Sequence, residues 1–485
     1  MHQGNKGLNG ARILRTASLI LVDIIAIYVS LYIAYVFRKH IAVQLFANRP
    51  AFPHSYFYYV NLFWIPIAYL FLTSYHGLYS RTRTFWEDAR EYVKSSVISF
   101  ILILTIATLY RKEGQYISRM IMIVYILNII WLNLLLRVVI VRALHSKRVF
   151  RKNIVIIGAG RTGRDLANAL SKERYLGYEV LGFIDDDPKK WGRTIGGLKV
   201  LGKTDDINND NLLNYIDKIF IAIPSLTSDK LMKLYAKLHV HCKEVVIIPQ
   251  IKGMALTNSE MHHLFNYDLP LLHVKNNFSY TANNVLKSLL DYVLVLMFLP
   301  FFLLLLFFIS LAIILESRGP VFYKHTRYAM NGKQIRVFKF RSMYNNADAR
   351  LKDLLENNEQ LRAEWRQNYK LHDDPRVTRV GKVLRKSSLD ELPQIINVMK
   401  GEMSFIGPRP VIKREFNRYY VHFSDYFSKV KPGITGLWQV SGRSNTKYDF
   451  RVRTDLWYVL NWSLWLDVVI LFKTVGVVIR GSGAY

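Results

Sequence analysis

The sequence predicts a multi-domain membrane protein that combines a four-helix transmembrane bundle, a Rossmann-like α/β domain, a further membrane helix and a mainly α C-terminal domain. Half of the 485 residues are apolar, yet the chain carries 66 Lys and Arg residues against 36 Asp and Glu. This combination is typical of a protein that sits in a membrane and holds a basic surface against anionic headgroups or phosphates. The domains are expected at 1–147, 148–275, 280–318 and 319–485.

Four apolar segments form the predicted bundle, at 13–37, 56–79, 93–110 and 120–144. Each is close to the ~20 residues that an α-helix needs to cross a bilayer. Asp23 lies inside the first segment. It either faces the interior of the bundle or serves as a plain polar group in helix packing, and the sequence leaves both alternatives open.

Basic residues flank these segments unevenly. Those between the second and third segments and after the fourth are Arg81, Arg83, Arg90, Arg142, Lys147, Arg148, Arg151 and Lys152. Because cytoplasmic loops carry the excess of Lys and Arg, both ends of the bundle are predicted to lie in the cytoplasm. The first loop, with Arg38, Lys39 and Arg49, fits this orientation less well. Nucleic acid is the weaker explanation of so many basic residues, given the long apolar runs.

A glycine pattern follows the bundle. Residues 153–157 form a buried strand pattern that runs into Gly158, Gly160 and Gly163 and then into a helical stretch. This is the G-x-G-x-x-G layout of a dinucleotide-binding turn. The same pattern also fits a tight strand–helix turn that binds no ligand. We keep these three glycines as a possible nucleotide turn. The single cysteine, Cys242, is expected to be a small buried residue.

A fifth apolar stretch covers 285–315 and is long enough to cross a membrane. Spanning is its simplest interpretation. Pro300 lies near its middle, however, and proline kinks or breaks a helix. Further on, 455–479 carries Trp457, Trp462 and Trp465, and because tryptophan prefers the membrane interface this tail is a candidate to lie on the bilayer. An ordinary amphipathic core helix is the alternative for each of these tryptophans.

The chemically most informative stretch is 373–410, and its centre is the adjacent carboxylate pair Asp390 and Glu391. Ser388 and Glu391 have the spacing of a capping box, which is the purely structural alternative. Many cations crowd the approach to the pair, which favours an anionic phosphate substrate over simple capping. They are Arg376, Arg379, Lys382, Arg385 and Lys386.

Three further motifs accompany the carboxylate pair: Lys339-Phe-Arg-Ser-Met343, Gly407-Pro-Arg-Pro410 and a glycine-punctuated loop from Lys431 to Arg443. Together with 373–410 they resemble the bacterial sugar transferases that act on polyprenyl phosphates, in the long form of that family. The resemblance covers most of the chain. It implies transfer of a hexose-1-phosphate from a UDP-hexose to undecaprenyl phosphate, an early step of surface polysaccharide synthesis such as capsule, exopolysaccharide or O-antigen.

The resemblance also implies a membrane arrangement. Lys287, Asp291 and Pro300 have the spacing of the family's re-entrant membrane helix, which enters the bilayer and returns to the same face. The catalytic domain then lies on the cytoplasmic face of the bacterial inner membrane, where nucleotide sugars are found. A homodimer is plausible, and contacts with membrane lipids are expected.

The same resemblance assigns the site residues. Asp390 is the expected nucleophile, which forms an aspartyl phospho-sugar and releases UMP, and Glu391 acts with the acceptor in the second step. Mg²⁺ is the expected cofactor, with Asp390 as its likeliest protein ligand, because adjacent carboxylates and a diphosphate need a hard cation. The expected substrate-binding residues are Lys339, Arg341, Arg385, Arg409, Gln439 and Arg443.

Two alternatives remain from the sequence. An NAD-dependent membrane sugar-nucleotide dehydratase or epimerase also joins membrane helices to a Rossmann turn. Such enzymes carry Tyr-x-x-x-Lys soon after that turn, and between Asn153 and Tyr280 no tyrosine is followed by lysine four positions later. A non-enzymatic scaffold or nucleotide sensor is the third interpretation. Galactose and glucose fit the expected donor about equally well.

Overall fold

The computed structural model describes residues 2–45, 55–80, 82–109, 118–147, 150–208, 216–239, 242, 244–249, 259–264, 269–357, 359, 362, 374–442 and 448–480. The chain divides into two compact units, Met1–Lys252 and Gly253–Tyr485. The first unit contains a group of long helices and an α/β domain. The second contains the fifth apolar stretch and the domain that carries the carboxylate pair.

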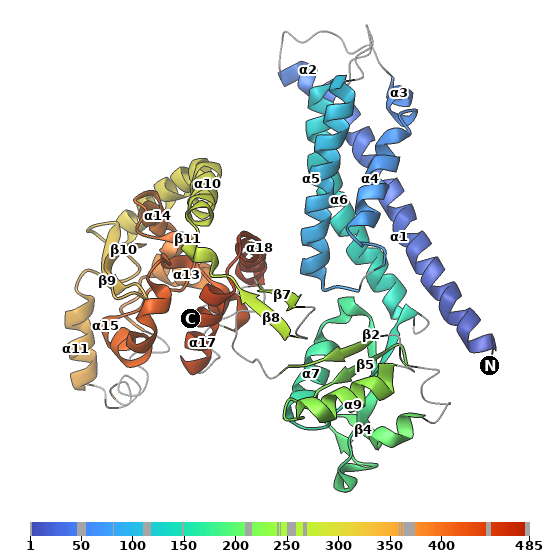
Figure 1. Ribbon diagram of the computed structural model, residues 1–485. Coiled ribbons are helices and arrows are strands. Elements are labelled where there is room, and N and C mark those ends of the chain that lie inside the picture. Colours follow the sequence, from blue (N-terminus) through green and yellow to red (C-terminus); the bar gives the residue numbers. More distant parts are fainter. Residues whose placement is uncertain are drawn as a thin grey trace. The chain divides into compact units, whose positions relative to one another are not determined.

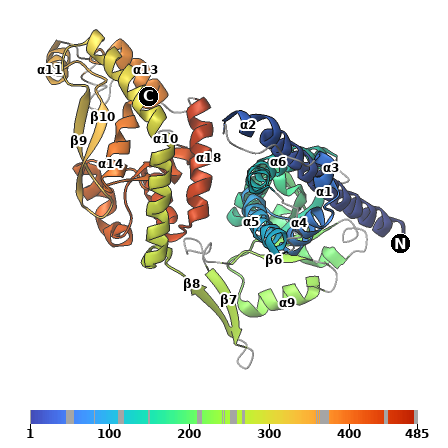
Figure 2. The same ribbon diagram turned by 90° about the horizontal axis from the view of Figure 1, so that it is seen from above.

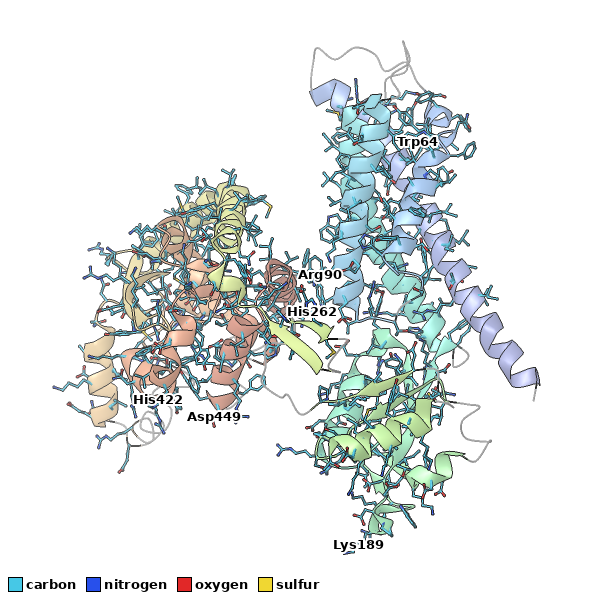
Figure 3. All side chains as sticks on the ribbon, viewed as in Figure 1. Trp64, Arg90, Lys189, His262, His422 and Asp449 are labelled. Atoms are coloured by element: carbon cyan, nitrogen blue, oxygen red, sulfur yellow. The ribbon has the colours of Figure 1, made fainter. Side chains whose placement is uncertain are left out.

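The helices of the first unit lie side by side along much of their length (Figure 1). They are α1 (His2–Val36), α2 (Ala42–Leu45), α3 (Tyr56–Val60), α4 (Trp64–Tyr75), α5 (Phe85–Leu109) and α6 (Arg119–Ser146), with a π-helical turn at Phe37–Ile41. Seen from above, α1, α4, α5 and α6 form one cluster (Figure 2). Trp64, at the start of α4, lies at the end of this cluster away from the sheet (Figure 3).

Within the described residues, three helices are long and apolar enough to cross a membrane: Ile13–Ile41, Met120–Ser146 and Thr281–Glu316. They identify the chain as a membrane protein by length and composition. The second predicted segment is divided between α3 and α4, and α4 has only 12 residues, fewer than the ~20 that span a bilayer. The third lies in α5, whose first turn carries Glu87 and Asp88.

The helix cluster has polar groups inside and apolar groups outside. Asp23 is fully buried, and its carboxylate accepts a hydrogen bond from the Tyr79 hydroxyl at 2.6 Å and lies 3.8 Å from Nη2 of Arg137. Leu21 and Leu135 are instead well exposed on the outer surface. Asp23 therefore faces the interior, and this inverted distribution is the one expected for helices surrounded by lipid.

The α/β domain is built on a six-stranded sheet with the order β3-β4-β2-β1-β5-β6. Its elements are β1 (Lys152–Ile157), α7 (Arg161–Lys172), β2 (Tyr178–Ile184), β3 (Thr194–Ile195), β4 (Leu198–Gly202), β5 (Lys218–Ile221), α9 (Ser228–His239) and β6 (Val245–Ile247). Strands β1, β2, β4, β5 and β6 are parallel, and β3 is antiparallel to β4. The central strand β1 is buried on both faces, as its run of Ile and Val predicts. Cys242 is buried beside this sheet, as expected. Lys189 lies at the tip of the domain away from the helices (Figure 3).

The second unit is mostly helical. Its elements are β7 (Ser259–Leu264), β8 (Leu269–Val274), α10 (Thr281–Glu316), β9 (Phe322–Tyr328), β10 (Gln334–Phe340), α11 (Ala347–Asn357), α13 (Arg379–Ser387), α14 (Ile395–Met399), β11 (Ser404–Ile406), α15 (Lys413–Glu415), β12 (Gly433–Thr435), α16 (Leu437–Ser441), α17 (Tyr448–Leu460) and α18 (Leu464–Arg480). A 3₁₀ helix, Leu389–Gln394, joins α13 to α14. A π-helical turn, Phe416–Tyr420, and a 3₁₀ helix, Val421–Phe427, follow α15.

Helix α10 remains helical through Pro300 and bends along its course (Figure 2). Most of its apolar side chains are exposed, with Leu296 at 72% and Leu315 at 78%. Both ends of α10 nevertheless bind the same domain. Near the start, Lys287 donates a hydrogen bond to the Asp467 carboxylate at 2.7 Å. At the end, the Glu316 carboxylate accepts hydrogen bonds from the backbone N–H groups that begin α13.

Of the two alternatives for the tryptophan-rich tail, a core position is the one that Trp462 takes. This side chain is buried, stacks on Phe278 and donates to Asp467 at 3.0 Å, because its indole fills the core beneath the start of α10. Trp457 is 41% exposed.

The exposed polar residues His422 and Asp449 lie on the side of this unit away from α10 (Figure 3).

Candidate active site

Asp390 and Glu391 lie in the first turn of the 3₁₀ helix that follows α13. Helix α13 ends at Ser387, and the next residue, Ser388, has a left-handed backbone with φ of 59°. This conformation costs a residue with a side chain about 1–2 kcal/mol, so the surrounding packing must hold the turn. Ser388 makes no side-chain capping bond. The capping-box alternative is therefore not formed, and the Glu391 carboxylate is directed elsewhere.

Lys339 reaches the carboxylate pair from strand β10. Its Nζ lies 2.7 Å from Oε1 of Glu391 and 3.6 Å from Oδ2 of Asp390. On the same face of β10, Ile335 and Val337 are buried in a core that includes Leu392, from the helix carrying the pair. The alternating pattern of the strand thus anchors β10 on its apolar residues and leaves Lys339 at the edge of that core, facing the carboxylates.

Asn397 fixes the strand that carries Lys339. Its side chain is fully buried on α14. Oδ1 accepts from the N–H of Phe338 at 3.0 Å, and Nδ2 donates to the carbonyl of Arg336 at 2.8 Å and to Glu402 at 2.7 Å. Because all these groups are satisfied only when β10 and α14 are in register, Asn397 sets the position of Lys339 relative to the carboxylates.

Arg409 reaches the site from a turn locked by glycines. The Gly407 N–H donates to the Thr435 carbonyl, and the Gly433 N–H donates to the Pro408 carbonyl, each at 2.9 Å. A Cβ atom on Gly433 would lie only 2.1 Å from the Gly407 nitrogen, so this approach requires glycine. The two glycine-containing motifs of the sequence therefore form one rigid support for Arg409.

Glu391 and Asp390 have different surroundings. Nη1 and Nη2 of Arg409 donate to the two carboxylate oxygens of Glu391, the first at 2.9 Å, and Lys339 adds a third donor. Among the described residues, no hydrogen bond reaches the carboxylate of Asp390, and its nearest cation is Lys339 at 3.6 Å. Glu391 is thus held as a neutralised anion, whereas Asp390 is available to react.

The electrostatics follow this division. Burial raises the pKa of Asp390, and the neighbouring charge of Glu391 raises it further, while Lys339, Arg385 and Arg409 act in the opposite direction. Burial also raises the pKa of Glu391, but Arg409 and Lys339 more than offset this and hold it well below its usual range. The two carboxyl groups are therefore separated in pKa by their partners, as expected for adjacent acids with different neighbours.

The remaining expected residues are distributed around this centre. Arg385 lies close enough to Asp390 to act on its pKa, and its Nε donates to Ser342 at 3.0 Å. Arg341 is turned toward the end of α10, where it donates to Ser317, Arg318 and Asn345. The structure therefore does not bring Arg341 to the carboxylates. Gln439 lies on α16 and donates to the Ile434 carbonyl, and Arg443 lies outside the described residues.

The residues at the centre fit Mg²⁺ as a single-carboxylate site. Within the described part of the chain, no group of three or more His, Cys, Asp and Glu side chains is arranged to hold a metal ion. Mg²⁺ does not need such a cage, since it commonly binds through one or two carboxylates together with substrate phosphates and water. The Asp390 carboxylate, without hydrogen bonds from the described residues, is suited to that part.

The glycine turn of the α/β domain has its own carboxylate. Asp185, at the end of β2, accepts from the Ala159 N–H at 2.8 Å and binds Lys190 at 2.9 Å. Gly158 has φ of 102°, and a Cβ on Gly163 would lie 1.9 Å from its carbonyl oxygen. Gly158 and Gly163 are thus explained by a close strand–helix turn. Around Gly160 there is open space for an added Cβ.

Several residues of this unit escaped the sequence analysis. Asp467 is one, because its partner Lys287 is 180 positions away and only folding brings them together. Asn397 and Arg327 are others, since nothing in the local sequence distinguishes a buried amide or a strand arginine from its neighbours. The alternation in this strand could have indicated that Tyr323, His325 and Arg327 share one face, but only the hairpin register shows that Lys339 lies on the same face.

Comparison with known proteins identifies two families along the chain. Residues 282–481 match the family described as bacterial sugar transferase. This region contains α10, the carboxylate pair and the glycine-locked turn. Residues 75–249 match a second family, described as CoA-binding domain, which covers α5, α6 and most of the α/β domain.

Three relatives cover large parts of the chain. The UDP-galactose-lipid carrier transferase of Erwinia amylovora is 35% identical over 88% of this chain and 86% of its own. The undecaprenyl-phosphate galactose phosphotransferase of Salmonella typhimurium is 36% identical, with the same coverage. The UDP-glucose:undecaprenyl-phosphate glucose-1-phosphate transferase of Escherichia coli is 34% identical over 67% of each chain. These similarities establish that the chain belongs to the bacterial sugar transferase family.

Proposed function

We propose that this protein transfers a hexose-1-phosphate from a UDP-hexose to undecaprenyl phosphate, giving undecaprenyl-diphosphate-sugar and UMP. The names of the relatives support galactose or glucose as the sugar. The observation that carries the proposal is the difference in hydrogen-bond partners between the two acids of the carboxylate pair. Glu391 is neutralised by Lys339 and Arg409, while Asp390 beside it has no hydrogen bond from the described residues.

In the proposed reaction, an oxygen of the Asp390 carboxylate attacks the phosphorus that carries the sugar. A bond forms between that oxygen and phosphorus, the bond from phosphorus to the UMP oxygen breaks, and UMP leaves with the electron pair. A phosphate oxygen of the lipid then attacks the same phosphorus, and the carboxylate of Asp390 is released. Splitting one displacement into two in this way is the general advantage of a covalent intermediate.

The residues around Asp390 bind and neutralise the substrate phosphates or orient the side chains that do so. Arg385 and Lys339 lie beside Asp390 and are suited to bind the phosphate oxygens, and arginine does so through its bidentate fork. The low pKa of Glu391 disfavours a role as proton carrier, so we assign it to orienting Lys339 and Arg409. Mg²⁺, when bound by Asp390 and the donor diphosphate, would withdraw charge from the phosphorus and stabilise the leaving UMP.

The membrane arrangement we propose has α10 as a re-entrant helix. Both ends of this 36-residue helix bind the same polar domain, through Lys287 near one end and Glu316 at the other. A straight spanning helix would need that domain on both sides of the bilayer. The domain then lies on the cytoplasmic face of the bacterial inner membrane. Helices α1, α4, α5 and α6 form the proposed transmembrane bundle. A homodimer stays a prediction.

The α/β domain we take as Rossmann-like, since a parallel strand, a glycine turn and a helix follow in order. Its turn differs from a dinucleotide site in one respect. The carboxylate of Asp185, at the end of the second strand, bonds to the turn's own Ala159 N–H and to Lys190. In dinucleotide sites an acidic residue near this place bonds to the ribose. This supports a structural turn over a dinucleotide site.

The proposed function is tested by UMP release from the purified protein with undecaprenyl phosphate, Mg²⁺ and a panel of UDP-sugars. We expect release with UDP-galactose or UDP-glucose, and its loss in Asp390→Asn. Asp449→Asn, which neutralises an exposed carboxylate of the same domain, is the matched control. Absence of release with every donor, or full activity in Asp390→Asn, would remove the proposal.

A further inference from the structure

Arg327 is a basic side chain near the carboxylate pair. Neither the sequence motifs nor the contacts of Asp390 and Glu391 give it a role. It lies on β9, where it pairs with Ile335 of β10 in the antiparallel register. Tyr323 pairs with Lys339 in the same register. Because side chains two positions apart share a strand face, Arg327 lies on the face from which Lys339 reaches the carboxylates.

A second contact places Arg327 beside the turn that carries Arg409. The next residue, Tyr328, exchanges two backbone hydrogen bonds with Val411, at 2.7 Å and 2.9 Å. Val411 follows Arg409 by two positions. Arg451 completes the group, since its Nη2 donates to the Arg409 carbonyl at 3.1 Å. Arginines from three separate elements therefore converge at this edge of the site.

The guanidinium of Arg327 is poorly satisfied by the protein. Among the described residues, its one hydrogen bond is a 3.5 Å contact between Nη2 and Nδ1 of His325. Burial lowers the pKa of His325 to about 4, so the imidazole is neutral at neutral pH and can accept this bond. Burial and the like charge of Arg409 also lower the pKa of Arg327, and Arg451 adds to this, while the carboxylates of Glu415 and Glu391 act in the opposite direction without offsetting it. An anion bound here would satisfy the donors and relieve this repulsion.

We infer that Arg327, supported by His325, binds a phosphate group of a substrate next to the carboxylate pair. This inference rests on the proposed function. The shared chemistry is a phosphate oxygen, which either the diphosphate of the UDP-hexose or the phosphate of the lipid supplies. Arginine suits both, because its planar fork donates two parallel hydrogen bonds to phosphate oxygens.

The test compares Arg327→Gln, Arg327→Lys and wild type as full-length protein, with Arg336→Gln as the matched control. Arg336 lies on the same hairpin, pairs with Thr326 and is exposed, on the opposite face from Arg327. Initial rates of UMP release are measured against UDP-hexose concentration at saturating undecaprenyl phosphate. A second series varies the undecaprenyl phosphate concentration at saturating UDP-hexose.

We expect Arg327→Gln to raise KM for one substrate by roughly 10-fold to 100-fold, the loss typical of a hydrogen bond between charged groups. Arg327→Lys should recover part of it, and Arg336→Gln should match wild type. A rise for UDP-hexose assigns the subsite to the donor diphosphate, and a rise for the lipid assigns it to the acceptor. Unchanged KM values, or a loss confined to kcat, would overturn the inference while wild-type activity still upheld the proposed function. If Arg327→Gln does not fold, Arg327→Lys decides by the same criterion.

Discussion

The two adjacent acids of the carboxylate pair, Asp390 and Glu391, differ in their hydrogen-bond partners. Glu391 has a guanidinium and an ammonium within hydrogen-bonding distance, whereas among the described residues Asp390 has only the Lys339 ammonium at 3.6 Å, beyond that distance. The sequence identified the pair and the cations around it. The family resemblance assigned the two acids different roles, but the sequence did not show their different partners. These depend on which carboxylate Lys339 and Arg409 reach, and both arrive from elements distant in the chain.

The raised pKa of Asp390 predicts a pH effect. A carboxyl nucleophile must be ionised, so activity falls as pH drops through its pKa. Lys339 lowers this pKa, and burial together with Glu391 raises it. Removing the cation in Lys339→Met therefore raises the pKa of Asp390, and the acidic limb of the kcat/KM profile should move to higher pH. The measurement is UMP release across the acid range.

Lys333→Met is the control for the pH prediction, because Lys333 is exposed near the turn of the same hairpin. Its acidic limb should coincide with that of wild type. An acidic limb that stays in place in Lys339→Met, or moves to lower pH, would contradict the assignment of Lys339 as the main cation acting on Asp390.

In the second unit, the individual elements were predicted more successfully from the sequence than the contacts between them. The apolar run at 285–315 and the glycine motifs correspond to α10 and the locked turn at Gly407. The contacts between elements were not predictable, because Arg341 and Lys339 lie two positions apart in one motif yet serve different partners. Arg341 binds the end of α10, whereas Lys339 binds the carboxylate pair.

The joint between β10 and α14 yields a stability prediction. Asn397→Ala removes three hydrogen bonds of a fully buried side chain and leaves the N–H of Phe338 and the carbonyl of Arg336 without this partner. The expected loss of unfolding free energy is about 2–4 kcal/mol. Thermal unfolding of the detergent-solubilised protein measures it. Gln334→Ala, an exposed change on the same strand, should alter the free energy by less than about 0.5 kcal/mol. Equal effects of the two variants would contradict a special role for Asn397.

For the whole molecule, the sequence predicted a membrane protein with basic flanks, and three helices meet the requirements of length and composition. The sequence did not predict which side chains form the interior of the helix cluster. Asp23 could have served either of two roles, and only the position of Tyr79 and Arg137 shows that it faces inward. The path of α10 depends in the same way on distant residues, because Asp467 and Arg379 bind its two ends.

The proposed re-entrant path predicts that both ends of α10 are accessible from the same side. Single cysteines introduced by Ser279→Cys and by Arg318→Cys, each in a Cys242→Ser background, place thiols at exposed positions before and after the helix. A membrane-impermeant maleimide should label both in inside-out vesicles and neither in intact cells. The Cys242→Ser protein alone is the unlabelled control. Labelling from opposite sides would instead indicate a spanning helix.

The claim on which this account of the molecule depends is that Asp390 carries the phospho-sugar. The most direct measurement is mass spectrometry of the purified protein after incubation with Mg²⁺ and UDP-hexose in the absence of lipid acceptor. We predict one hexose phosphate per chain, located on Asp390, absent from Asp390→Asn and discharged when undecaprenyl phosphate is added. UMP release without any adduct, or an adduct on another residue, would contradict the nucleophile assignment.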